Sequence, residues 1–192
     1  LIHFILETDA YDAAQSIFRG TFDLADIVFL IILLFLLLCS ALASASEVAY
    51  FSLSPGELEK LKEKGYDKVA NLHQKPNLLL STILITNNFV NVGIVILSTY
   101  LVNSLFDFSG NPVLGFIIQV IGVTFIILLF GEIIPKLYAN RSQVKMAIFM
   151  AGPLTFLTYL FRPLSTLLIR STSLISKRMA DRKSTRLTPV TS

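Results

Sequence analysis

Charged side chains are scarce in this sequence. Only 15% of its 192 residues are Asp, Glu, Lys or Arg, whereas 54% are hydrophobic. Soluble domains average about 25% charged residues, and the mean hydropathy here is +0.70. This composition excludes an ordinary soluble domain and predicts a membrane protein.

Cysteine and histidine are also nearly absent. The single cysteine, Cys39, lies inside an apolar run, which excludes a disulfide framework and favours a small packing residue. His3 and His73 lie far apart and outside the apolar runs, so they do not form a zinc site. The chain begins with leucine and ends in "DRKSTRLTPVTS", so we expect both ends to be cut or processed.

Three apolar runs are long enough to cross a membrane, which takes about 20 mostly apolar residues. The predicted spans cover residues 27–51, 78–102 and 112–138. Between the second and third spans, Asn103, Ser104 and Asp107 are assigned to a short outer turn.

The placement of lysine and arginine predicts the orientation. The loop between the first two spans is rich in lysine, and the next loop, 103–111, has none. We therefore expect residues 1–23 to be extracellular or periplasmic and the lysine-rich loop to be cytoplasmic. Within that loop, residues 54–77 predict a helical hairpin, in which Gly65 ends the first helix.

A fourth apolar run, 146–169, is interrupted by Pro153 and Pro163. If it crossed the membrane, the strongly basic tail would lie outside, against the charge rule. We therefore predict juxtamembrane helices over about 141–178 and a cytoplasmic tail at 181–192. Four spans is the alternative.

Polar residues recur at helical spacing inside the predicted spans. Ser40 and Ser44 are four apart and share one face, as do Asn87 and Asn91, whereas Asn88 lies off that line. The third span carries Gly131 and Glu132. A carboxylate at the centre of a span costs roughly 2.5–3.5 kcal/mol, so its presence needs a compensating interaction.

Pro135 lies four residues after Gly131 in "FGEIIPK". Proline has no N–H to donate to the carbonyl four residues back, so the Gly131 carbonyl is freed beside the Glu132 carboxylate. A kink or a π-type turn is expected there.

The candidate ligands are therefore serine hydroxyls, asparagine amide oxygens, a backbone carbonyl and one carboxylate. Such hard oxygen ligands suit Mg²⁺, Ca²⁺ or Na⁺. Other interpretations stay open: the serines could be small packing residues, the asparagines could join helices by hydrogen bonds, and Glu132 could pair with Lys136.

Three motifs together resemble the CorC/CNNM magnesium transporter family. "ALASASEVAYFSLS" (41–54) is similar to the family's serine-rich first-span motif, "ILITNNFVN" (83–91) to its second-span asparagine motif, and "FGEIIPK" (130–136) to its Gly-Glu-x-x-Pro motif. The resemblance extends over roughly 24–180. Thr86 replaces a frequent glycine and Ala43 a frequent phenylalanine, and neither change removes a ligand.

The resemblance implies an all-α membrane protein with three transmembrane helices per subunit, a cytoplasmic helical hairpin and a juxtamembrane helix belt. It implies a homodimer in the membrane lipid, and a pair of cytosolic CBS domains after the membrane domain. It also implies an inward-open cavity that binds dehydrated Mg²⁺. The positions carried over as metal ligands are Ser40, Ser44, Asn87, Asn91, Gly131 and Glu132.

We therefore expect a secondary transporter that exports Mg²⁺ in exchange for Na⁺, in a bacterial inner membrane. The alternative is a membrane anchor or assembly scaffold whose polar core serves dimerisation. An intramembrane enzyme is disfavoured because the spans carry one deep carboxylate and no Ser/His pair or zinc set. We expect no nucleic-acid partner.

Overall fold

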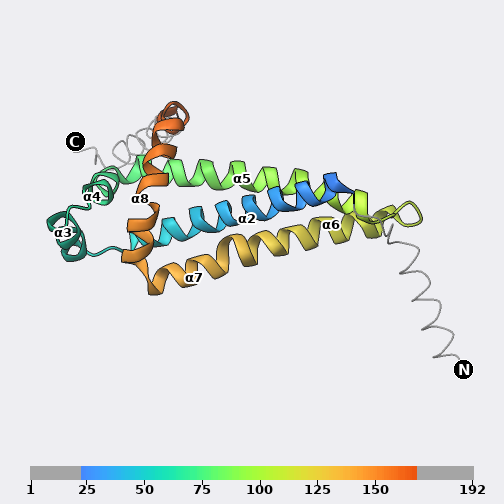
Figure 1. Ribbon diagram of the computed structural model, residues 1–192, viewed down its shortest axis with the longest axis horizontal. Helices are drawn as coiled ribbons and strands as arrows, with labels where there is room; N and C mark the ends of the chain where they lie inside the picture. The colour runs from blue at the N-terminus through green and yellow to red at the C-terminus, as the bar shows by residue number, and fades with distance from the viewer. Residues whose placement is uncertain (1–22, 168–192) are drawn as a thin grey trace, which may run out of the picture. The chain divides into compact units, whose positions relative to one another are not determined.

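The computed structural model describes residues 23–167, and its elements are helices (Figure 1). Three of the described helices are long and apolar enough to cross a membrane. They are α2 (Leu24–Phe51), α5 (Pro76–Leu105) and the continuous helix Pro112–Arg141, which consists of α6 (Pro112–Ile126), η1 (Ile127–Ile133) and α7 (Ile134–Arg141). The predicted all-α fold with three spans is confirmed.

The chain divides into two compact units. The first contains residues 23–45 and 87–138 of the described chain, and the second contains 46–86 and 139–167. The predicted segment 1–23 lies outside the described residues except for Asp23. The end of the predicted juxtamembrane belt and the tail at 181–192 also lie outside them.

The first unit is built on an apolar seam between three helices. Val90 and Ile94 of α5 and Ile127 of η1 are buried together. Partly buried apolar side chains pack against them, from α2 (Leu33, Leu36, Leu37 and Cys39) and α6 (Val123). Most other apolar side chains of these helices are exposed, as expected where lipid covers the outer surface.

The third span contains the predicted irregular turn. Residues Ile127–Ile133 form a π-helix, and the N–H of Ile134 reaches back five residues to the carbonyl of Leu129. Pro135 follows directly in α7 and cannot supply the N–H that an α-helix would give to Gly131. The wider π-turn is one of the recognised ways to accommodate such a break, and these turns are frequent at functional sites.

The assignment of Asn103 and Ser104 to the outer turn was wrong. α5 continues to Leu105, so both Asn103 and Ser104 are helical. The Ser104 hydroxyl donates a 2.7 Å hydrogen bond to Oδ1 of Asp26, whose other carboxylate oxygen accepts from the N–H of Asp23. Asp26 is only 2% exposed. This hydrogen bond joins the first turn of α2 to the last turn of α5. It gives the polar end of α5 a buried partner, which helps the helix to continue past its apolar residues to Leu105.

The second unit contains the predicted helical hairpin, α3 (Pro55–Glu63) and α4 (Asp67–His73). Gly65 adopts φ +82°, and the N–H groups of Gly65 and Tyr66 bond to the carbonyls of Lys62 and Leu61. This is the Schellman ending that glycine favours, so Gly65 does end α3 as predicted.

A capping box begins the hairpin. The Ser54 hydroxyl accepts from the N–H of Glu57, and the Glu57 carboxylate accepts from the N–H of Ser54. The backbone hydrogen bond from Ser54, followed by its hydroxyl and the Gln143 amide, lowers the pKa of Glu57. The Ser-x-x-Glu spacing of residues 54–57 is the signal from which this cap could have been predicted.

The helix α8 (Gln143–Leu160) is joined to the other helices of the second unit. Tyr50 is only 1% exposed. Its hydroxyl donates a 3.0 Å hydrogen bond to the backbone carbonyl of Ala147 in α8. A further helical stretch, 162–167, follows α8, and there Ser165 lies 3.4 Å from the hydroxyl of Thr82. These contacts fix α8 against the C-terminal end of α2, and the stretch that follows α8 against the N-terminal part of α5.

Candidate functional site

Three side-chain oxygens meet in the first unit, where α2 faces α5. The Ser40 hydroxyl oxygen lies 2.9 Å from Oδ1 of Asn87 and 2.8 Å from Oδ1 of Asn91. Ser40 is completely buried and both asparagines are half-buried. The structure therefore brings together three of the predicted ligands, and the four-residue spacing of the asparagines explains why both reach the same hydroxyl.

The proton count of this cluster is unusual. A serine hydroxyl carries one proton, whereas the amide oxygens of Asn87 and Asn91 carry none and can only accept. Two acceptors therefore share a single donor, and lone pairs are in excess in a buried place. A bound cation would stabilise such an oxygen cluster, because it supplies the positive charge that the missing proton does not.

Gly131 in η1 lies next to the cluster. A β-carbon at this position would lie 3.0 Å from the Ser40 hydroxyl oxygen and 3.5 Å from the Ser40 β-carbon. Because Gly131 is buried and has no side chain, the backbone of η1 can approach the hydroxyl closely. The fourth predicted ligand is thus adjacent to the other three.

Ser44 lies one helical turn beyond Ser40 on α2 and is completely buried. Its hydroxyl oxygen has no hydrogen-bond partner within residues 23–167. Buried hydroxyls nearly always have a partner, so an unpaired one needs an explanation, and an absent ion is one of the recognised explanations.

Glu132 follows Gly131 within the π-helix and is half-buried. Its position in the chain brings a carboxylate next to the glycine that contacts Ser40. The structure thus gathers Ser40, Asn87, Asn91 and Gly131 by direct approach. Within residues 23–167 no side-chain hydrogen bond joins Ser44 or Glu132 to this cluster; they lie on the same helices, one turn after Ser40 and one residue after Gly131.

The family model described as "Cyclin M transmembrane N-terminal domain" matches residues 31–192. This chain belongs to the CNNM family. The matched range includes the whole oxygen cluster, so the resemblance drawn from the sequence motifs is confirmed.

Relatives of this CNNM domain occur in bacteria and animals. An UPF0053 protein of Haemophilus influenzae is 36% identical over 137 residues, which is 70% of this chain and 31% of that protein. The polyamine export protein of the same organism is 29% identical over 140 residues, which is 67% of this chain and 32% of that protein. Metal transporter cnnm-4 of Caenorhabditis elegans is 31% identical over 123 residues, which is 58% of this chain and 25% of that protein. The chain thus spans about a third or less of the length of these relatives.

Sequence reasoning missed a second polar contact in the first unit of the CNNM domain. Gln119 of α6 donates a hydrogen bond to the hydroxyl of Thr99 in α5. A glutamine inside an apolar run is a signal in itself, but nothing in its spacing names the partner twenty residues earlier.

Replacing each serine of the CNNM cluster in turn distinguishes a partnered hydroxyl from an unpartnered one. In metal-free buffer, Ser40→Ala should lower the free energy of unfolding by about 1–2 kcal/mol, because the two asparagine oxygens lose their donor. Ser44→Ala should leave it unchanged or raise it, because a buried, unpaired hydroxyl is removed. Denaturant titration in detergent measures both. Equal destabilisation by the two changes would mean that Ser44 is an ordinary packing residue.

Proposed function

We propose that this chain is the membrane domain of a secondary transporter that exports Mg²⁺ in exchange for Na⁺. Its metal ligands are Ser40, Ser44, Asn87, Asn91, Gly131 through its carbonyl, and Glu132. The observation that carries the proposal is the convergence of the Asn87 and Asn91 oxygens on one buried serine hydroxyl. A family member named as a metal transporter supports the same class of cargo.

The chemistry of the ligands favours a small hard cation. Mg²⁺ prefers six oxygen ligands at short distances and gives up its water reluctantly, so a site that strips its water must be compact. The Ser40 hydroxyl oxygen lies 2.8–2.9 Å from the two asparagine oxygens, so these three candidate ligands are already as close together as a compact site requires. The π-turn beside Pro135 adds a backbone oxygen to the set, as broken helices do in other ion transporters.

Polyamine export is the second candidate, because one relative carries that name. A polyamine is a long chain with several ammonium groups, so its binding needs several acceptors spread along a path. The oxygens described here are gathered at one point, which suits a single small ion better. A scaffold with a polar dimerisation core is the third candidate, and it requires no ion.

The proposed topology follows from the placement of charge. The N-terminus lies outside, and the α3–α4 hairpin and α8 lie on the cytoplasmic side of a bacterial inner membrane. Two copies form the transporter, and CBS domains follow in the full-length protein. Under this topology Glu132, in the inner half of the third span, is reached from the cytoplasm.

A thermal-unfolding titration of the purified chain tests the proposed cargo. Mg²⁺ should raise the melting temperature by several degrees, because a ligand at 100 times its Kd stabilises by about 2.7 kcal/mol. Asn87→Ala should abolish this shift. The neighbouring Asn88→Ala, at an exposed position off the ligand line, should retain it.

The same titration separates the three candidates. Stabilisation by spermidine but not by Mg²⁺ would favour polyamine export, and no stabilisation by either would favour the scaffold. If Mg²⁺ binds, its release from proteoliposomes against an opposing Na⁺ gradient tests the exchange. Release that is independent of Na⁺ would contradict the coupling.

A further inference from the structure

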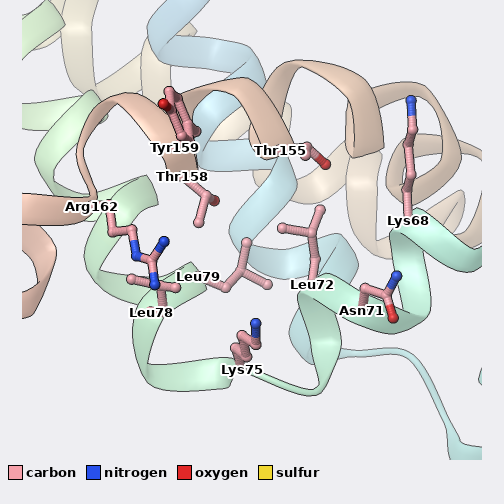
Figure 2. Close-up of a pocket in the computed structure, with 10 residues that line it drawn as sticks. All are labelled: Lys68, Asn71, Leu72, Lys75, Leu78, Leu79, Thr155, Thr158, Tyr159 and Arg162. Atoms are coloured by element: carbon pink, nitrogen blue, oxygen red, sulfur yellow. The ribbon is translucent and has the colours of Figure 1, made fainter.

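The second unit contains a cavity that plays no part in the proposed ion site. It encloses about 290 Å³ and lies between α4, the first turn of α5 and the end of α8 (Figure 2). Its volume is just below the range for drug-sized ligand pockets, about 300–1,000 Å³. A small headgroup or a single phosphate ester fits this space.

The charge of the lining has one sign. Lys68, Lys75 and Arg162 line the cavity, and no acidic residue is among its lining residues. Figure 2 shows Arg162 at one end of the lining, Lys68 at the other end and Lys75 between them along the lower edge. The hairpin helix α3 is different, because its lysines alternate with glutamates. The cavity therefore concentrates positive charge, which favours an anionic ligand.

The cavity also contains an unsatisfied polar atom. The hydroxyl oxygen of Thr158 is buried and has no hydrogen-bond partner in the described part of the chain. Thr155, one turn earlier, donates to the carbonyl of Ala151 and needs no other partner. A hydroxyl can donate to a phosphate oxygen, so Thr158 offers a further contact beside Lys75 and Arg162.

Three leucines supply an apolar part of the lining, which also includes Asn71 and Tyr159. Leu72 comes from α4, and Leu78 and Leu79 come from the first turn of the span α5. Figure 2 shows Leu79 and Leu72 between Arg162 and Lys68, with Leu78 beside Arg162. A ligand that suits this lining has an anionic group joined to an apolar part, as a phospholipid has.

The walls of the cavity are held in place. Leu79 and Leu154 are 2% and 1% exposed, so α5 and α8 pack tightly behind the lining. The contact between Thr82 and Ser165 joins α5 to the helical stretch that carries Arg162. The basic side chains therefore extend from fixed backbone positions.

We propose that this cavity binds the phosphate headgroup of an anionic phospholipid from the cytoplasmic leaflet. Lys75 and Arg162 pair with the phosphate, Thr158 donates to it, and the acyl chains leave along Leu78 toward the lipid. Basic pockets beside transmembrane helices on the cytoplasmic side bind anionic headgroups in other membrane proteins. The assignment to the cytoplasmic leaflet rests on the topology proposed above. The lipid site itself shares no residue with the proposed ion site, so it does not depend on which ion is transported.

Native mass spectrometry of the purified chain with phosphatidylglycerol or phosphatidylcholine tests this site. The chain should bind one phosphatidylglycerol tightly and prefer it to phosphatidylcholine. The double variant Lys75→Gln/Arg162→Gln should bind it about 30-fold more weakly, since each basic residue near a membrane surface contributes about 1 kcal/mol. Thr158→Val should weaken it by a smaller factor, because it removes the hydroxyl and keeps the shape.

The matched control is Lys62→Gln/Lys64→Gln, which removes two exposed charges from the end of the α3 helix and should leave binding unchanged. Equal weakening by both double variants would overturn the proposal, because the attraction would then be diffuse. Inorganic phosphate and glycerol phosphate are added as competitors. If either displaces the lipid at micromolar concentration, the ligand is a soluble phosphate and the lipid assignment is wrong.

Discussion

Glu132→Gln should abolish Mg²⁺ binding at physiological concentrations. The carboxylate is the only full negative charge among the six proposed ligands, and glutamine keeps its size and one oxygen while removing the charge. Removing one partner of a buried charge pair costs about 2–5 kcal/mol, which corresponds to an increase in Kd of about 30- to 5,000-fold. Calorimetric titration of the purified chain with MgCl₂ measures the change.

The control for this experiment is Glu59→Gln, which removes an equal charge from an exposed position on α3. Glu59→Gln should bind Mg²⁺ with the same Kd as the unaltered chain. In metal-free buffer, Glu132→Gln should be at least as stable as the unaltered chain, because a half-buried carboxylate at membrane depth is costly. Wild-type affinity in Glu132→Gln would remove Glu132 from the ligand set.

Regular spacing made part of the proposed ion site predictable. Asparagines four residues apart must share a helix face, so the spacing predicted that Asn87 and Asn91 act together. Their grouping with Ser40 rested on the family resemblance, and the three oxygens do meet. The π-turn was predictable for a similar reason, because the missing N–H of Pro135 is a property of the residue itself. In both cases the information is local in the sequence.

Contacts between distant residues were not predictable in this way. The bond from Ser104 to Asp26 joins residues 78 apart, and neither residue has a spacing that indicates the other. The same holds for the cavity in the second unit, whose basic residues come from α4 (Lys68), the α4–α5 connection (Lys75) and the helical stretch after α8 (Arg162). The lysines of the loop between the first two spans predicted the orientation of the chain in the membrane. That two of them line one cavity with Arg162 depends on how α8 packs, which the spacing of the lysines does not indicate.

Adding one methyl group at Gly131 should disrupt the ion site. In most helices Gly→Ala is stabilising by about 0.5–1 kcal/mol, because it reduces the freedom of the unfolded chain. At Gly131 the new β-carbon would lie 3.0 Å from the Ser40 hydroxyl oxygen. Ser40 is completely buried and held between Asn87 and Asn91, so it cannot move away without breaking the cluster. We therefore expect Gly131→Ala to lose stability and to bind Mg²⁺ at least tenfold more weakly.

The chain offers a matched control in Gly122 of α6, where a β-carbon would meet nothing within 4 Å. Gly122→Ala should raise the melting temperature slightly and leave the Mg²⁺ affinity unchanged. Thermal unfolding with and without Mg²⁺, measured on both variants, separates the two effects. If the two variants behaved alike, the close approach of η1 to Ser40 would have no role in the site, and the Gly131 carbonyl would lose its place among the ligands. If only Gly131→Ala fails to respond to Mg²⁺, then the π-helix positions its backbone against α2 to complete the ligand set.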